Sequence, residues 1–164
     1  MLPLEPGWRR VVHARPMMSA TSTIEARRAS IEAVLASFRS GQERLAWMVD
    51  QARRAAPLPP ACRVPTNQVE GCLAKLWISC HYREGRCFYA CDSDSLVTKA
   101  LALVLCELHS GCTPAEILTS DPSFLAPLGI TQHLTPNRRN ALSRVVERLQ
   151  RFATSSLAAE ANSQ

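Results

Sequence analysis

One segment, from about Ser95 to Ser110, restricts the fold more than any other part of this sequence. Apolar residues recur along it at helical spacing and cover most of its circumference. They are Val97, Leu101, Val104, Leu105 and Leu108. The residues Asp92-Ser93-Asp94-Ser95 supply helix caps at its start, and Gly111 ends it. A helix that is apolar on nearly every side must be covered by other elements, so we expect it at the centre of the domain.

A hairpin of two short strands is expected just before this central helix. The residue pattern predicts strands over 75–82 and 87–92, joined by a tight turn at 83–86. If Glu84 and Gly85 form the centre of the turn, alternate residues of both strands share one face of the hairpin. In that register Tyr82 pairs with Cys87 and Cys80 with Tyr89, and the same face carries Ile78 and Cys91.

Helical patterns occupy most of the remaining sequence. We expect helices over about 23–40 and 42–56, separated by a break at Gly41, and the prolines of 57–60 end the second helix. Three helix starts follow the central helix: a capping box at 113–116, a short turn at 121–122, and a last helix from Thr135-Pro136 to about Ala153. Helix dominates, and strands do not alternate with helices. The predicted fold class is therefore α+β, with a small antiparallel hairpin packed against several helices.

Length and local composition indicate one domain with an additional segment at each end. The 164 residues are enough for a single core. Residues 1–22 show no periodicity and contain three prolines, so we expect a flexible N-terminal extension there. The domain is expected over residues 23–153, and the polar residues 154–164 are expected to be a disordered tail.

Cysteine content and charge limit the compartment and the class of partner. Seven cysteines, an odd number, follow no secretory signal, so we expect a reducing compartment, the cytoplasm, rather than a disulfide framework. Targeting to an organelle such as the plastid by the arginine-bearing extension is the weaker alternative. The formal net charge is +5, but no basic run is interleaved with aromatic residues. No apolar run reaches about 18 residues, so we expect neither nucleic acid nor a membrane as a partner.

One cysteine has a conspicuous position before the first expected strand. The polar, turn-forming run of residues 65–70 ends in Gly71, and Cys72 follows. Glycine adopts backbone conformations closed to other residues, so the chain can turn sharply there and present Cys72 at the tip of a loop. An accessible thiolate is what a nucleophile or a sulfur carrier needs. The alternative interpretation of Cys72 is a small apolar residue where a loop enters a strand.

The cysteines and histidines do not show the spacing of a metal site. The sequence contains no CxxC pair and no other common zinc spacing. In the predicted hairpin Cys87 and Cys91 are on the order of 13 Å apart, whereas a zinc–sulfur bond is about 2.3 Å long. We therefore expect no metal site and interpret most of the cysteines as core residues. His81, His109 and His133 do not stand at an offset that indicates Cys-His catalysis.

Four stretches of the sequence carry a resemblance to a known family. They are Pro57-Leu58-Pro59-Pro60 with Arg63 and Asn67-Gln68-Val69-Glu70-Gly71-Cys72; Leu76-Trp77; Asp92-Ser93-Asp94-Ser95-Leu96-Val97-Thr98-Lys99-Ala100; and Thr131-Gln132-His133-Leu134-Thr135-Pro136-Asn137-Arg138. In these stretches and in their order, the chain resembles SufE, the sulfur-acceptor protein of iron–sulfur cluster assembly. The resemblance extends from roughly Leu35 to Ala153.

The resemblance implies a SufE/IscU-like fold and a role in sulfur transfer. A pyridoxal-phosphate-dependent cysteine desulfurase of the SufS type would hold sulfur as a persulfide. Cys72 would accept this sulfur and pass it to an iron–sulfur cluster scaffold of the SufB type. By the same resemblance the carrier has no cofactor of its own, and it is a sulfurtransferase-type activator of the desulfurase rather than a free-standing enzyme. Whether it forms a homodimer stays open.

The matched motifs also indicate which residues support the loop of Cys72. These residues are Arg63, Gly71, Asp94, His133 and Arg138. We expect them to hold Cys72 against the hairpin and the start of the central helix, and to release it when the desulfurase binds. Two positions depart from the family. Cys91 stands where the family has glycine or another small residue, which raises the question of a second thiol near Cys72, and Ala74-Lys75 replaces a Ser-Gln type pair.

Two other functions stay open from the sequence. One is an iron–sulfur cluster scaffold or zinc-binding module of related fold, which requires three converging ligands. The other is a structural interaction domain in which Cys72 is inert. That domain would make no use of the position of Cys72 directly after Gly71.

Overall fold

The computed structural model describes residues 23–162, and the extension expected for residues 1–22 lies outside that part. The helices are α2 (Ile24–Ala36), α3 (Gly41–Arg54), α4 (Leu96–His109), α5 (Pro114–Thr119) and α6 (Pro136–Ala161). The strands are β1 (Leu76–Arg83) and β2 (Arg86–Ser93), and short 3₁₀ turns are η1 (Pro60–Cys62), η2 (Pro65–Asn67), η3 (Pro122–Leu125) and η4 (Thr131–His133). A two-stranded antiparallel sheet among helices confirms the α+β class.

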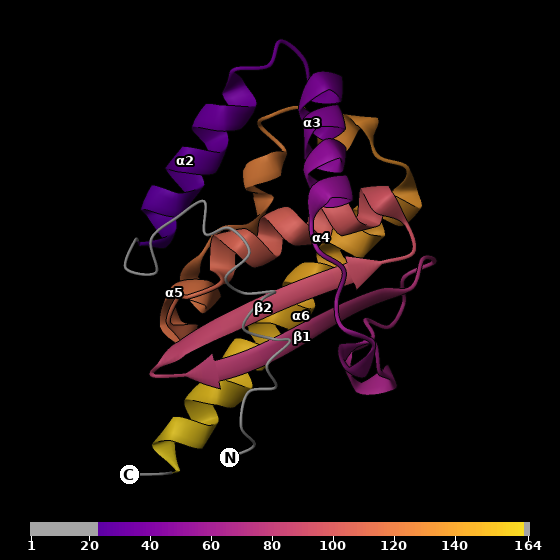
Figure 1. Ribbon diagram of the computed structural model, residues 1–164. Coiled ribbons are helices and arrows are strands. Elements are labelled where there is room, and N and C mark those ends of the chain that lie inside the picture. Colours follow the sequence, from indigo (N-terminus) through magenta and orange to yellow (C-terminus); the bar gives the residue numbers. More distant parts are fainter. Residues whose placement is uncertain (1–22, 163–164) are drawn as a thin grey trace.

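The hairpin has the register that its turn predicts. Tyr82 pairs with Cys87 and Cys80 pairs with Tyr89. The turn residue Glu84 and the glycine after it both have positive φ angles, 52° and 76°, as a tight hairpin turn requires. In Figure 1 the hairpin lies across α6, and β2 packs against α4. The cysteine-bearing face of the hairpin therefore faces the helices.

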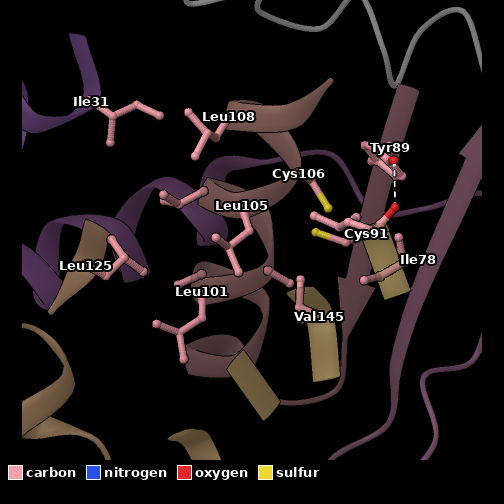
Figure 2. Packing of buried hydrophobic residues seen from close by; sticks show 14 of the residues in the cluster. Ile31, Ile78, Tyr89, Cys91, Leu101, Leu105, Cys106, Leu108, Leu125 and Val145 are labelled. Carbon is pink, nitrogen blue, oxygen red and sulfur yellow. Dashed lines mark hydrogen bonds between the residues drawn. The ribbon is translucent and has the colours of Figure 1, made fainter. Parts of the chain in front are cut away.

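Helix α4 lies at the centre of the core, as its apolar circumference predicts. Leu101, Leu105 and Leu108 are almost completely buried. Figure 2 shows these side chains reaching toward Ile31 of α2 on one side and Val145 of α6 on another. Helix α3 also packs on α4, so α2, α3, α6 and the hairpin surround α4 in one core. Within residues 23–162 no helix combines the length and the apolar character that crossing a membrane requires.

Gly41 begins α3, so its expected role as the end of the first helix is wrong. The first helix ends at Ala36, and Ser40 caps α3 by accepting a hydrogen bond from the amide of Glu43 at 3.1 Å. A Cβ atom on Gly41 would stand 2.2 Å from the carbonyl oxygen of Gly129. Glycine is needed here because two backbone segments approach closely, not because a helix stops.

Helix α6 continues past its expected end as far as Ala161. The prediction of a disordered tail over 154–164 is therefore wrong for the residues up to Ala161, and 163–164 lie outside the described residues. Ser156 is buried, and the hydroxyl of Tyr82 donates to the carboxylate of Glu160. These contacts with the hairpin explain why a polar sequence stays helical, since tertiary packing supplies most of the stability of a protein helix.

Candidate functional site

Cys72 lies in a loop whose two ends are paired with each other. The amide of Val69 donates to the carbonyl of Leu76 at 2.8 Å, and Gln68 forms an antiparallel bridge with Trp77. This pairing closes residues 70–75 into a short loop, here called the Cys72 loop. It leads into β1 at the end of the hairpin from which β2 continues toward α4 (Figure 1). The sequence prediction of a loop directly before the first strand is confirmed.

Gly71 occupies the position where the loop turns. Its φ angle is +77°, in the left-handed region where other residues are strained. A Cβ atom there would also stand 3.1 Å from Nε of Arg144 in α6. The carbonyl oxygen of Gly71 accepts a hydrogen bond from the Asn140 side chain, also in α6, at 2.8 Å. Gly71 therefore allows both the turn and the close approach of the loop to α6.

The thiol of Cys72 is partly buried, whereas the next side chain points into solvent. Cys72 packs against the main hydrophobic core, while Leu73 is 84% exposed. Burial raises the pKa of the Cys72 thiol, and the positive charge of Arg144 partly opposes that rise. The contact of Cys72 with the hairpin and the start of α4 stays a prediction, whereas Asn140 and Arg144 place α6 beside the loop.

Asp94 anchors the residue through which the loop enters β1. Its carboxylate accepts the amide of Lys75 at 3.0 Å, and its own amide donates to the carbonyl of Lys75 at 3.1 Å. The hydroxyl of Ser93 donates to the same carbonyl at 2.7 Å. Of the predicted support residues, Asp94 is therefore placed directly against the Cys72 loop.

Asp92 is the centre of a buried ion-pair network rather than a helix cap, since the side chain that caps α4 is Ser95. Its carboxylate accepts the amide of Leu58 at 2.9 Å and lies 3.2 Å from the ammonium of Lys99. It also pairs with the guanidinium group of Arg63. Burial alone would raise the pKa of Asp92, but the Leu58 and Lys99 interactions outweigh it, and the pKa is lowered.

Arg63 joins this network to the paired segment beneath the loop. Its guanidinium carbon lies 5.7 Å from the ring centre of Trp77, the residue bridged to Gln68. Cation–π contact and ion pairing together fix the position of Arg63. The structure therefore places Arg63 in contact with Asp92 and with Trp77, one of the paired residues that close the Cys72 loop.

The remaining two predicted support residues have no side-chain hydrogen bond or ion pair within residues 23–162. His133 is exposed, and its Cδ2 stands 3.0 Å from where a Cβ atom on Gly41 would lie, at the start of α3. Arg138 is in the first turn of α6, where its amide donates to the carbonyl of Thr135 at 3.0 Å. The structure does not bring these side chains into hydrogen-bond contact with the Cys72 loop, and their role in releasing it stays a prediction.

Three residues of α6 that the sequence analysis did not select make contacts around the loop. Besides Asn140 and Arg144, Arg148 donates through Nη2 to the carbonyl of Thr66 at 3.0 Å. The three side chains are four residues apart, so they lie on one stripe of the helix. The four-residue spacing of these polar side chains, next to the apolar stripe of α6, can be recognised in the sequence. It shows a polar face but not which loop that face meets.

Five of the other six thiols, all except that of Cys62, are less available than Cys72. Cys87, Cys91, Cys106 and Cys112 are buried, and burial raises the pKa of Cys80 and of Cys112 to about 11. In Figure 2 the sulfur atoms of Cys91 and Cys106 point toward each other inside the core. Their interaction and burial hold the pKa of Cys106 well above that of an ordinary thiol. Cys91 thus contacts a buried partner of its own.

No group of three or more histidine, cysteine, aspartate or glutamate side chains in the described part of the chain is arranged to hold a metal ion. The cluster scaffold and the zinc module need at least three such ligands. The geometry of residues 23–162 therefore does not support either alternative, and the expectation that the whole protein binds no metal stays a prediction.

Comparison with known proteins gives matches over most of the chain. The family model SufE, described as the Fe-S metabolism associated domain, matches residues 29–153. The chain is 33% identical over 127 residues to SufE-like protein 1, chloroplastic/mitochondrial, of Arabidopsis thaliana. The aligned region covers 75% of this chain but only 34% of that protein. It is 29% identical over 108 residues to an uncharacterized SufE-like protein of Synechocystis, covering 66% of each.

A solved structure shares the fold. The solution structure of a hypothetical protein from Thermus thermophilus superimposes with a TM-score of 0.66 and covers 80% of this chain and 96% of that chain. Its sequence identity to this chain is 22%, so this likeness supports the α+β architecture alone.

Proposed function

Because this chain belongs to the SufE family, the Fe-S metabolism associated domain, we propose that it accepts and carries sulfur on Cys72. The donor is a persulfide on a pyridoxal-phosphate-dependent cysteine desulfurase, and the receiver is an iron–sulfur cluster scaffold. The pyridoxal phosphate belongs to the desulfurase, and the carrier itself uses no cofactor. Activity, substrate and partners are part of the proposal, since the chain spans 34% of the Arabidopsis relative.

The proposed step is an exchange between a thiolate and a persulfide. The Cys72 thiolate attacks the outer sulfur of the desulfurase persulfide, and a new sulfur–sulfur bond forms on Cys72. The bond to the desulfurase cysteine breaks, and that cysteine leaves as a thiolate. Sulfur oxidation states are only exchanged between the two proteins, so no outside oxidant or reductant is needed.

The observation that carries the proposal is the environment of Cys72 compared with the other thiols. It lies in a short loop, partly exposed, next to an 84% exposed leucine, Leu73. Four of the seven cysteines are buried, and burial makes a thiol inert. Cys80 is also partly exposed, but burial raises its pKa to about 11, so it is largely protonated near neutral pH. Cys62 is partly exposed as well, but it lies in η1, outside the Cys72 loop, and it is the control in the experiment below.

Anaerobic mass spectrometry tests the assignment. The protein is incubated with a cysteine desulfurase and free cysteine, and the mass of the peptide that contains Cys72 is measured. We expect this peptide to gain one sulfur atom in the wild type and in the matched control Cys62→Ser. Cys72→Ser should gain none while it keeps the wild-type circular dichroism spectrum. Sulfur uptake by Cys72→Ser at the wild-type level would overturn the proposal.

We also propose that the loop shields Cys72 until the desulfurase binds. The loop is attached by a few polar contacts, through Gly71 and Lys75, and such segments open at low free-energy cost. An exposed persulfide would be lost to oxidants and small thiols. Adding a desulfurase that lacks its catalytic cysteine should raise the rate of iodoacetamide labelling at Cys72. If free Cys72 already reacts as fast as an unstructured cysteine peptide, the loop gives no shielding.

A further inference from the structure

We propose that Arg144 of α6 is a positioning residue for Cys72, whose guanidinium group holds the anionic form of the sulfur in the loop. The inference deepens the proposed function and rests on Cys72 as the sulfur acceptor. It assigns to this chain a cationic partner for the thiolate that lies far away in sequence, 72 positions from Cys72 (144 minus 72).

The backbone beside Cys72 is held at a defined distance from Arg144. Nε of Arg144 stands 3.1 Å from the point that a Cβ atom on Gly71 would occupy. One helical turn earlier, Asn140 bonds the carbonyl of Gly71 at 2.8 Å. One turn later, Arg148 bonds the carbonyl of Thr66 at 3.0 Å. Arg144 therefore lies beside Gly71, between the two side chains whose hydrogen bonds join α6 to the loop and to the segment before it.

Arg144 is also the charged side chain that acts on the pKa of Cys72. The other charged side chains near it in sequence are Glu70 and Lys75, and both are exposed. From the connection between β2 and α4, Asp94 faces the loop, but its carboxylate accepts the amide of Lys75. Among the described groups, the charge of Arg144 lowers the pKa of Cys72 against the rise that burial causes.

Glu147 holds the guanidinium group from its other side. Nη1 of Arg144 lies 3.0 Å from the Glu147 carboxylate, and about half of each side chain is exposed, at 45% and 50%. A half-exposed pair of this kind contributes little to stability. It orients Arg144 without competing strongly for its charge, so Nε and the open edge of the guanidinium remain directed at the loop.

The same arrangement suits the product of the proposed transfer. The persulfide on Cys72 also carries its negative charge on sulfur, and a charge-assisted contact with arginine favours anionic sulfur in either form. Arg144 thus favours formation of the attacking thiolate before transfer and retention of the loaded loop after it.

The pH profile of Cys72 alkylation in the free protein tests this role. The rate of iodoacetamide labelling is measured by peptide mass from neutral to alkaline pH for the wild type, Arg144→Gln, Arg144→Lys and Arg151→Gln. Arg151 is an exposed arginine on the same helix, so its substitution removes the same charge without touching the loop. Urea unfolding of each variant checks that the fold is retained.

We expect Arg144→Gln to slow labelling near neutral pH by about threefold to tenfold and to move the midpoint of the profile to higher pH. The rates should converge on the alkaline side, where the thiol is ionised in both proteins. Arg144→Lys should recover part of the shift, because a lysine keeps the charge but not the planar geometry. Arg151→Gln should follow the wild type.

Two results would overturn the inference. One is an unchanged midpoint with a changed alkaline plateau, which would make Arg144 only a structural support of the loop. The other is an equal shift in Arg151→Gln, which would reduce the effect to net charge. Neither depends on sulfur transfer. If Cys72 of the wild type takes up no sulfur while the Arg144→Gln midpoint still shifts, the proposed function fails and the ionisation role stands.

Discussion

Cys72 lies in a loop attached to the domain by polar contacts, whereas Cys106 lies in α4 among apolar side chains. Partial burial raises the pKa of Cys72, and the positive charge of Arg144 in α6 opposes that rise. Cys106 is 2% exposed, contacts Cys91, and has a strongly raised pKa. One residue type therefore serves as a candidate nucleophile in one region and as core material in the other. The difference lies in the access of water and positive charge, which control the thiolate fraction.

The largest effect is expected at Asp92, which joins the two regions. It ties Arg63, below the loop, to Lys99 of the buried helix. Asp92→Ala leaves the buried ammonium group of Lys99 without its carboxylate partner and should lower the free energy of unfolding by about 3–5 kcal/mol. Urea unfolding measures this loss. Asp94→Ala is the matched control and should cost only about 1 kcal/mol, and equal losses in both variants would contradict the network.

The second largest effect is expected in the rates at which iodoacetamide labels Cys72 in the loop and Cys106 in the core. Cys106 reacts only after local opening of the core, so iodoacetamide should modify it about a hundredfold more slowly than Cys72, or slower still. Peptide mass spectrometry of one native sample over time gives both rates. In urea the rates should become similar, which serves as the internal control. Comparable rates in the native protein would remove the distinction between loop and core.

Truncation of the two thiols should show the same contrast in stability. Cys106→Ala removes a buried sulfur and should cost about 1–3 kcal/mol. Cys72→Ala removes a partly exposed one and should cost less than about 1 kcal/mol. Denaturant midpoints measure both. A larger loss for Cys72→Ala would mean that the loop, too, is a packing element.

The smallest expected effect is the acid dependence contributed by Asp92. Its pKa is lower in the folded protein than the ordinary value of 3.8, so it adds stability above about pH 4 that is lost as the pH falls through the folded pKa. Unfolding free energies of the wild type should therefore fall more steeply below about pH 4 than those of Asp92→Asn. Parallel curves would show that Asp92 carries no such linkage.

Much of the candidate site follows from the sequence, although not the residues that surround it. The glycine before Cys72 predicts the turn, and the hairpin register places Cys80, Cys87 and Cys91 on the inner face. The Arg63 and Asp94 motifs lie beneath and beside the loop. His133 lies instead beside Gly41, because a motif match does not specify the direction of a side chain.

Local patterns in the sequence are enough to predict the α+β class, the hairpin, the buried central helix and the loop of Cys72. These features depend on residues that are near one another in the chain, where periodicity, turns and caps act over a few positions. The packing of α6 places Asn140, 69 positions from Gly71, and Arg144 beside the loop, and no local pattern predicts this. The tertiary structure also shows that α6 extends to Ala161 and that Asp92 is buried. Such contacts depend on how whole helices pack around one core, and no short sequence pattern contains that information.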